Sequence, residues 1–216
     1  MLQFTWPFSP QQNPRVLCLG AHSDDIEIGC GGTILRLLAE HSNLSVYWVV
    51  FSANQARRRE ALTSARLFLG GTKSKKIVVH SFRDGFFPYQ GARIKREFEL
   101  LKAINPAVIL THFRHDLHQD HRLVNELTWN TFRNHLILEY EIPKYDGDLG
   151  APNVFVPLSE FVCRQKAEYL SRAFQTQRGK HWFTDGTFLG LMRLRGVESG
   201  SRQKHAEAFY ARKLVF

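Results

Sequence analysis

Two short segments of this sequence combine histidines with carboxylates at spacings that suit metal chemistry. The first, residues 21–33, reads AHSDDIEIGCGGT, and the second, residues 116–121, reads DLHQDH. Imidazoles and carboxylates are common ligands of divalent metals, and a metal site that keeps an open position can activate a water molecule. Together the segments offer two imidazoles and a carboxylate for one metal ion. They leave a second carboxylate and a further imidazole for proton transfer.

The elements that precede the two segments must bring them together. Residues 16–20 and residues 107–111 are apolar runs typical of buried strands, and each run comes shortly before one of the segments. Open α/β sheets place their chemistry just beyond the carboxyl ends of the strands, where the winding of the chain reverses. In the common strand order 3-2-1-4-5, strands one and four are neighbours. We therefore predict a metal site at the carboxyl ends of strands one and four.

Strand-like and helix-like patterns alternate along most of the chain. We expect strands at residues 16–19, 46–51, 77–79, 107–111 and 136–138, and helices at residues 32–40, 54–69, 94–104, 119–134 and 159–174. Residues 143–152 are rich in turn formers and predict a long loop, whereas residues 184–209 carry a weaker pattern. The alternation predicts an α/β fold with a Rossmann-like, mostly parallel sheet and helices on both faces.

Length and composition narrow the class of protein. A chain of 216 residues with 44% hydrophobic and 23% charged residues predicts a single globular domain spanning residues 1–216. No apolar run approaches the roughly 18 residues of a membrane span. The first seven residues lack the features of a signal peptide, so we expect a cytoplasmic protein.

The net charge of +9 fits an anionic partner. However, Lys and Arg residues are spread along the chain, and Arg57-Arg58-Arg59 is the one tight triplet. The sequence shows no zinc finger, RNA-recognition signature or basic-aromatic repeat. We therefore expect a small-molecule partner rather than nucleic acid, and the sequence leaves a homo-oligomer open.

The two segments resemble those of the LmbE-like, or PIG-L, deacetylases. That family carries AHPDDxExGxGGT after its first strand and DxHxDH after a later one, and weaker similarity continues through residues 58–61, 69–70, 195–196 and 206–209. The resemblance thus spans nearly the whole chain. Its clear departure is Ser23, where the family usually has proline. This change loses a rigid backbone angle but removes no metal ligand.

The resemblance implies that His22, Asp25 and His121 bind zinc. Two imidazoles and one carboxylate suit zinc and leave a position for water, and ferrous iron fits the same ligand set. Asp24, next to a carboxylate committed to the metal, is then the expected general base.

The second segment supplies the remaining expected roles. By resemblance, His118 stabilises the tetrahedral oxyanion and protonates the departing amine. Asp120 is expected to orient the His118 imidazole and to hold its charge.

Several nearby residues are weaker candidates. Histidines 112 and 115 are expected behind the ligands or facing solvent, and Asp116 and Glu27 are expected to brace their loops. Glycines 29, 31 and 32 are expected to let the backbone approach the site and to open the next helix. Arg58 and Arg59 are candidates to bind a substrate hydroxyl or phosphate, and a solvated helix face is an equal alternative.

The resemblance implies a zinc-dependent hydrolase that removes an acetyl group from an N-acetylglucosamine-type sugar or sugar conjugate. One alternative is a 2-His-1-carboxylate Fe(II) oxygenase, because that ligand set is the same. Another is a non-catalytic sugar-binding homologue. The sequence leaves open whether the sugar is free or linked to a nucleotide, a lipid or a thiol, and we assign specificity to the loop over residues 140–157.

Overall fold

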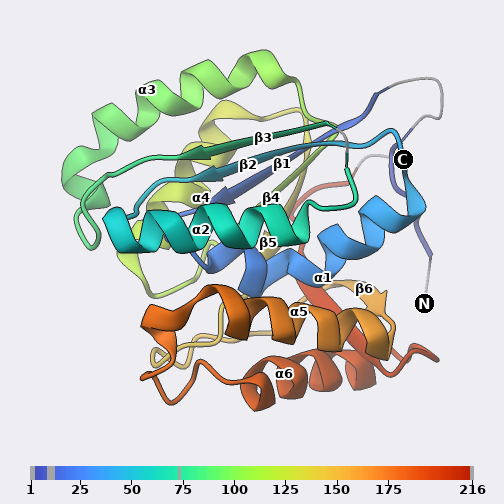
Figure 1. Cartoon of the computed structure of the whole chain (residues 1–216). Helices are drawn as coiled ribbons and strands as arrows, with labels where there is room; N and C mark the ends of the chain where they lie inside the picture. Colours follow the sequence, from blue (N-terminus) through green and yellow to red (C-terminus); the bar gives the residue numbers. More distant parts are fainter. Residues whose placement is uncertain (1–2, 9–12, 73, 215–216) are drawn as a thin grey trace.

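A mixed sheet forms the centre of the molecule (Figure 1). The computed structural model describes residues 3–8, 13–72 and 74–214, and within these residues the sheet has seven strands in the order β3-β2-β1-β4-β5-β7-β6. The strands are β1 (Arg15–Gly20), β2 (Ser45–Val50), β3 (Ser74–Val79), β4 (Val108–His112), β5 (Leu136–Tyr140), β6 (Val154–Leu158) and β7 (His205–Tyr210).

The first five strands run parallel in the order predicted from the sequence. β1 pairs with β2 on one side and β4 on the other, so the winding reverses between β1 and β4. β7 runs antiparallel to both β5 and β6 and lies between them, so β6 is the edge strand on this side. The predicted mostly parallel α/β fold is confirmed.

Helices cover both faces of the sheet (Figure 1). One face carries α1 (Asp25–Glu40), α2 (Gln55–Phe68), α5 (Glu160–Ala173) and α6 (Asp185–Glu198), and the other carries α3 (Gly91–Leu101) and α4 (Gln119–Thr131). Short 3-10 turns lie at Phe87–Gln90, Lys102–Ile104 and Gln175–Gln177. Successive residues of β1 point to opposite faces: Cys18 packs in the core under α1, and Leu19 packs in the core under α4.

The start of α1 differs from the prediction. We expected a loop over the first segment and a helix from Gly32, but the helix begins at Asp25. Three glycines weaken intrinsic helix propensity, which favoured a loop. Tertiary packing overrides this propensity, because α1 lies so close to its neighbours that side chains would not fit. A Cβ atom on Gly29 would overlap the Tyr140 ring, and one on Gly31 would lie 2.5 Å from Phe68.

The C-terminal third contains elements that the sequence pattern did not predict. β6 lies at the end of the segment expected as a loop, and α6 and β7 lie within residues 184–209. Of the first seven residues, where we expected no signal peptide, residues 1 and 2 lie outside the described part of the chain. Among the residues described, none of the helices combines the length and the apolar character that crossing a bilayer requires.

Candidate functional site

The predicted site residues meet at the carboxyl ends of β1 and β4. Residues 22–25 follow β1 and enter α1, and residues 118–121 form the start of α4. The centre of the His22 ring lies 4.8 Å from that of His118 and 5.1 Å from that of His121. The neighbouring positions of β1 and β4 in the sheet therefore bring together residues from distant parts of the chain, as predicted.

Three of these side chains present ligand atoms to one point. His22 Nδ1 lies 3.1 Å from His121 Nε2 and 3.5 Å from Asp25 Oδ2, and His121 Nε2 lies 3.6 Å from Asp25 Oδ2. A tetrahedral zinc ion with bonds of about 2.0–2.1 Å has its ligand atoms roughly 3.3–3.4 Å apart. The predicted trio therefore has the spacing needed to hold one metal ion.

Each of the three side chains is held from behind. His121 Nδ1 lies 2.8 Å from Asp116 Oδ2, which leaves Nε2 facing the common point. The His22 backbone N–H donates to Asp25 Oδ2 over 2.6 Å. His22 Nε2 lies 3.0 Å from Asp84 Oδ1. Such contacts fix the tautomer and ring orientation of metal-binding histidines.

The charges of the trio also suit a cation. Burial and the neighbouring His112 lower the pKa of His121 to about 4, so its ring is neutral at neutral pH. Although burial alone would raise the pKa of Asp25, the surrounding histidines hold it well below its ordinary value. Burial would lower the pKa of His22, but Asp25, Asp120 and Asp84 raise it well above the ordinary value. The carboxylates of Asp25, Asp84 and Asp120 thus favour positive charge at this point, which a metal ion would supply once His22 gives up its proton.

Asp24 sits at the N-cap position of α1 but does not cap the helix with its side chain. Its Oδ1 instead accepts a hydrogen bond of 2.6 Å from Arg57 Nη2. Burial raises the pKa of Asp24 even though Arg57 opposes this shift. A carboxylate that adjoins Asp25 in the sequence and has a raised pKa is suited to accept a proton from water.

The Asp120 carboxylate contacts His22 rather than His118, although its charge opposes the lowering of the His118 pKa as expected. We predicted that its carboxylate orients the His118 imidazole, but Asp120 Oδ2 lies 3.3 Å from His22 Nε2. Backbone N–H groups of Gly85 and Phe87 donate to the same carboxylate over 2.7 and 3.1 Å, and they turn it toward His22. The His118 ring instead accepts a hydrogen bond of 3.2 Å from the backbone N–H of Asp120.

His118 itself lies beside the trio. Its ring stacks on that of His121 with 4.6 Å between ring centres. Burial and the nearby His22 lower the pKa of His118 below its ordinary value. The ring lies close enough to the metal position to act on a substrate bound there.

The other two histidines of this region lie outside the trio, as expected. His112 is fully buried with its Nε2 3.2 Å from Asp25 Oδ2, but the same Nε2 accepts the Ala21 backbone N–H over 2.9 Å. That hydrogen bond occupies the lone pair that a metal would need. His115 is exposed.

The structure also shows three residues that sequence reasoning missed. Arg57 contacts Asp24, Asp84 contacts His22, and Lys144 contacts Asp116. In the sequence, only their positions after β2, β3 and β5 could have indicated a role at the site. These strands are parallel to β1 and β4, so the segments that follow them begin at the same end of the sheet.

Two other expectations change. Arg58, a candidate for substrate binding, donates to the carbonyl of Val79. Glu27 lies fully buried inside α1 rather than in a loop, and burial raises its pKa well above the ordinary value.

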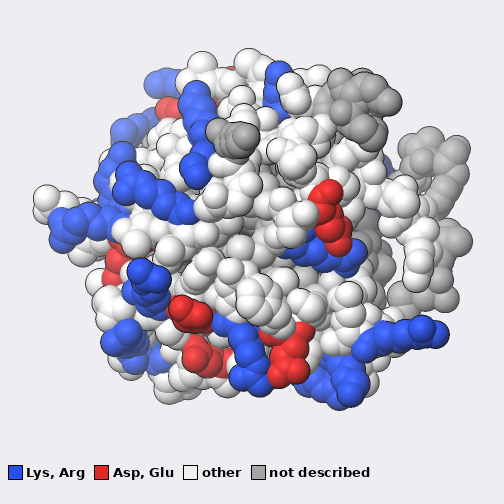
Figure 2. Space-filling model, turned by 45° about the vertical axis from the view of Figure 1, so that its right-hand side comes forward, with Lys and Arg blue, Asp and Glu red and all other residues white. Residues whose placement is uncertain are grey.

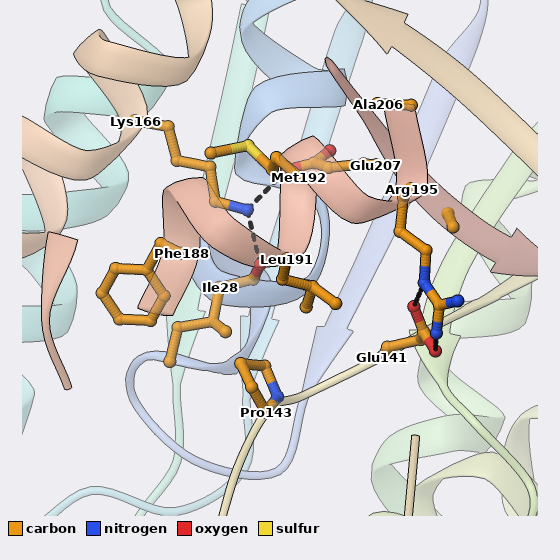
Figure 3. A pocket seen from close by; sticks show the side chains of 12 residues that line it. Ile28, Glu141, Pro143, Lys166, Phe188, Leu191, Met192, Arg195, Ala206 and Glu207 are labelled. Atoms are coloured by element: carbon orange, nitrogen blue, oxygen red, sulfur yellow. Dashed lines mark hydrogen bonds and ion pairs between the residues drawn. The ribbon is translucent and has the colours of Figure 1, made fainter. Parts of the chain in front are cut away.

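A separate small cavity is lined by residues 28–29 of α1 together with residues of α5, α6 and β7 (Figure 3). Its volume is about 20 Å³, which is room for about one water molecule. Two buried ion pairs line it, Lys166 with Glu207 and Arg195 with Glu141. The cavity is too small for a sugar and belongs to the interior.

Positive and negative side chains are mixed on the face of the molecule shown in Figure 2. On this face, Lys and Arg side chains stand in separate groups with Asp and Glu between several of them. This distribution differs from the continuous basic stripe that marks many nucleic-acid-binding surfaces.

Several solved structures share the fold. N,N'-diacetylchitobiose deacetylase from Pyrococcus horikoshii is 21% identical with a TM-score of 0.67, over 93% of this chain and 86% of that chain. A conserved protein from Thermus thermophilus is 22% identical with a TM-score of 0.69, over 93% and 96%. GalB, the 4-carboxy-2-hydroxymuconate hydratase from Pseudomonas putida, is 17% identical with a TM-score of 0.71, over 94% and 98%. Because a hydratase shares the fold, the fold alone does not decide the reaction.

The sequence match is more specific than the fold. The family model PIG-L, described as GlcNAc-PI de-N-acetylase, matches residues 17–132, which is more than half of the chain. The matched region runs from β1 through α4 and contains both histidine-carboxylate segments. The chain therefore belongs to the PIG-L family, as its resemblance predicted.

Proposed function

We propose that this protein is a metal-dependent N-deacetylase acting on an N-acetylglucosamine-type sugar or sugar conjugate. The observation that carries the proposal is the mutual spacing of His22, Asp25 and His121, with ligand atoms 3.1–3.6 Å apart. Membership of the PIG-L family supports the same reaction. The deacetylase of Pyrococcus horikoshii, named for N,N'-diacetylchitobiose, shows that this fold can support a deacetylation reaction.

The metal site is assigned to His22 Nδ1, Asp25 Oδ2 and His121 Nε2. Zinc is our choice for these ligands, and ferrous iron suits the same set. A zinc ion bound there would polarise the amide carbonyl and lower the pKa of water enough to supply hydroxide at neutral pH.

Two residues move protons in the proposed reaction. Asp24 takes a proton from the attacking water, and Arg57 holds its carboxylate in place. His118, in its protonated form, donates a proton to the nitrogen of the sugar as the C–N bond breaks, and it stabilises negative charge on the former carbonyl oxygen. The proton that Asp24 took from water then restores the protonated form of His118. Water and the amide thus become acetate and a free amine.

Asp120 is assigned a positioning role in the same site. Its carboxylate accepts from two backbone N–H groups and holds Nε2 of His22, so that Nδ1 faces the metal position. This assignment replaces the expected pairing of Asp120 with His118.

The segment after β5 is proposed to contribute to specificity. Tyr145 is exposed and its ring packs edge-on against His181 with 5.0 Å between ring centres. Leu149 is also exposed. Both residues belong to the segment that contacts Asp116 and Leu117, and an aromatic ring and an apolar side chain suit the ring face of a sugar or its attached group.

Acetate release tests the proposal. We would assay the metal-free protein and the protein with one equivalent of zinc on N-acetylglucosamine, N,N'-diacetylchitobiose, a nucleotide-linked N-acetyl sugar and a lipid-linked one. We expect acetate and free amine in equal amounts from at least one substrate, with activity lost on chelation and restored by zinc. A protein that binds one zinc ion but releases acetate from none of them would contradict the proposal. Oxygen uptake by the iron-loaded protein would favour the oxygenase alternative.

A further inference from the structure

Lys144 reaches the second histidine-carboxylate segment from outside it. Its Nζ lies 3.0 Å from Asp116 Oδ2, and it also pairs with Asp148. The Lys144 side chain is only 9% exposed, so its charge is largely withdrawn from water. Lys144 lies beyond residues 17–132, the region that matches the family model.

Asp116 connects Lys144 to both active-site histidines of this segment. Its Oδ2 lies 2.8 Å from Nδ1 of His121, and its Oδ1 accepts the His118 backbone N–H over 2.8 Å. The carboxylate is buried, with 3% of its side chain exposed. The position of this one group therefore sets the ring of one histidine and the backbone of the other.

A second contact anchors the same stretch of chain. Asp148 Oδ2 accepts the backbone N–H of Leu117 over 2.7 Å. Gly147, with φ of 62°, makes the turn that brings Asp148 back to Lys144. The segment thus has two separate attachments, one to the Asp116 side chain and one to the Leu117 backbone.

We propose that Lys144 is a positioning residue that acts through Asp116 to fix His121 and His118. The inference rests on the proposed function, because it takes His121 as a metal ligand. A buried carboxylate that has lost its cation is destabilised, because its charge is neither paired nor solvated. It therefore moves toward water or another hydrogen-bond donor. Asp116 would then no longer hold the His121 ring with Nε2 toward the metal position. Losing such an indirect support typically weakens metal binding by about 10–100-fold.

Zinc affinity measures this effect directly. We would titrate zinc alone against a chromophoric chelator in the wild type and in Lys144→Met, which keeps the length of the side chain but not its charge. We expect zinc affinity to fall about 10–100-fold in Lys144→Met and to be largely restored in Lys144→Arg. In Asp116→Asn, adding Lys144→Met should cause little further loss, because Lys144 acts through Asp116. The cobalt-loaded Lys144→Met variant should show an absorption spectrum that differs from that of the cobalt-loaded wild type.

Two control variants separate positioning from general packing. Lys95→Met removes an ammonium that pairs with Glu99 on α3 and donates to Thr131 at the C-terminal end of α4, and it should leave zinc affinity unchanged. Asp148→Asn weakens the attachment to Leu117 and removes the charge that Asp148 presents to Lys144, but it keeps the Lys144–Asp116 pair. A loss of zinc affinity in Asp148→Asn equal to that in Lys144→Met would show that the pair with Asp116 is not what matters and would overturn the inference.

Other outcomes are also decisive. Unchanged zinc affinity in a folded Lys144→Met variant would overturn the inference. If that variant is less stable, the rise in Tm caused by added zinc still reports metal binding, and a rise equal to that of the wild type would have the same meaning. Failure of the wild type to bind stoichiometric zinc would instead contradict the proposed function.

Discussion

At the level of single residues, His121 has two ring nitrogens with separate tasks. Nδ1 contacts Asp116, while Nε2 faces His22 and Asp25. Replacing His121 by alanine removes one of three ligands, so we expect a strong loss of bound zinc measured by elemental analysis. The exposed His115 gives a matched control, and His115→Ala should retain zinc. Full zinc content in His121→Ala would disprove the assignment.

Asp24 allows metal binding and proton transfer to be separated. Asp24→Asn nearly preserves shape and the contact with Arg57, but an amide does not accept a proton from water. We expect retained zinc and a loss of about 10²–10⁴-fold in kcat, measured by steady-state kinetics on the substrate found in the acetate screen. Glu168→Gln, at an exposed position of α5, makes the same carboxylate-to-amide change and should leave kcat unaltered. Near-normal turnover in Asp24→Asn would mean that another group activates the water.

The sequence predicts the central residues better than their partners. His22, Asp25 and His121 meet because two strand ends are neighbours, and strand order follows from the alternation of elements. The partner of Asp120 depends on where the loop of residues 80–87 directs its backbone N–H groups. No periodicity encodes that loop conformation, so the sequence pattern did not predict it.

At the level of elements, α1 shows what close packing requires of a helix. Gly29 faces Tyr140 so closely that a methyl group would overlap the ring. We expect Gly29→Ala to lower the free energy of unfolding by about 1–3 kcal/mol, measured by urea denaturation. Gly190 lies within α6 with open space around it, so Gly190→Ala should raise stability by about 0.5–1 kcal/mol. Equal effects of the two changes would refute the packing argument.

The same helix explains a failure of prediction by propensity. Glycine-rich residues 29–32 suggested a loop because glycine is a poor helix former. These glycines allow close packing of α1 against β5, α2 and β6, and no local sequence pattern reveals such long-range contacts. By contrast, the apolar runs of β1, β2, β4 and β5 encoded burial directly, and the first five strands were predicted in the right order.

The end of β3 carries a histidine whose charge opposes folding. His80 stacks on Phe51, and burial lowers its pKa below the ordinary 6.5 although Glu97 opposes this. Because the unfolded chain binds the proton first, stability from the neutral ring is present above pH 6.5 and declines as pH falls below it. We expect the stability advantage of the wild type over His80→Gln to be smaller at pH 5.5 than at pH 7.5. A constant difference in unfolding free energy would show that His80 does not contribute to pH dependence.

At the level of the whole molecule, Glu207 joins the C-terminal strand to α1. It accepts the backbone N–H groups of Gly32 and Thr33 over 2.8 and 2.6 Å. It also pairs with Lys166, whose ammonium donates to the Ile28 carbonyl, and this buried group lies beside the cavity of Figure 3. One carboxylate thus connects β7, α5 and the interior of α1.

Removing this carboxylate should have a large effect on stability. Glu207→Ala leaves the ammonium of Lys166 buried without its partner, and we expect a loss of about 3–5 kcal/mol in unfolding free energy. Arg164→Ala removes an exposed pair with Glu160 on the same helix as Lys166 and should change stability little. Similar results for the two variants in thermal or urea unfolding would argue against a special role for the buried pair.

The place of β7 in the sheet also governs the order of events during synthesis. β6 is made before β7, yet in the finished sheet β7 lies between β5 and β6. Until residues 205–210 leave the ribosome, β6 lacks its neighbour and β5 presents an open edge to which strands of other chains can add. Glu207 emerges with the same strand, so the nascent chain must wait for it before the Lys166 charge can be neutralised. A single late segment thus covers the open edge of β5 and completes the interior at the same moment.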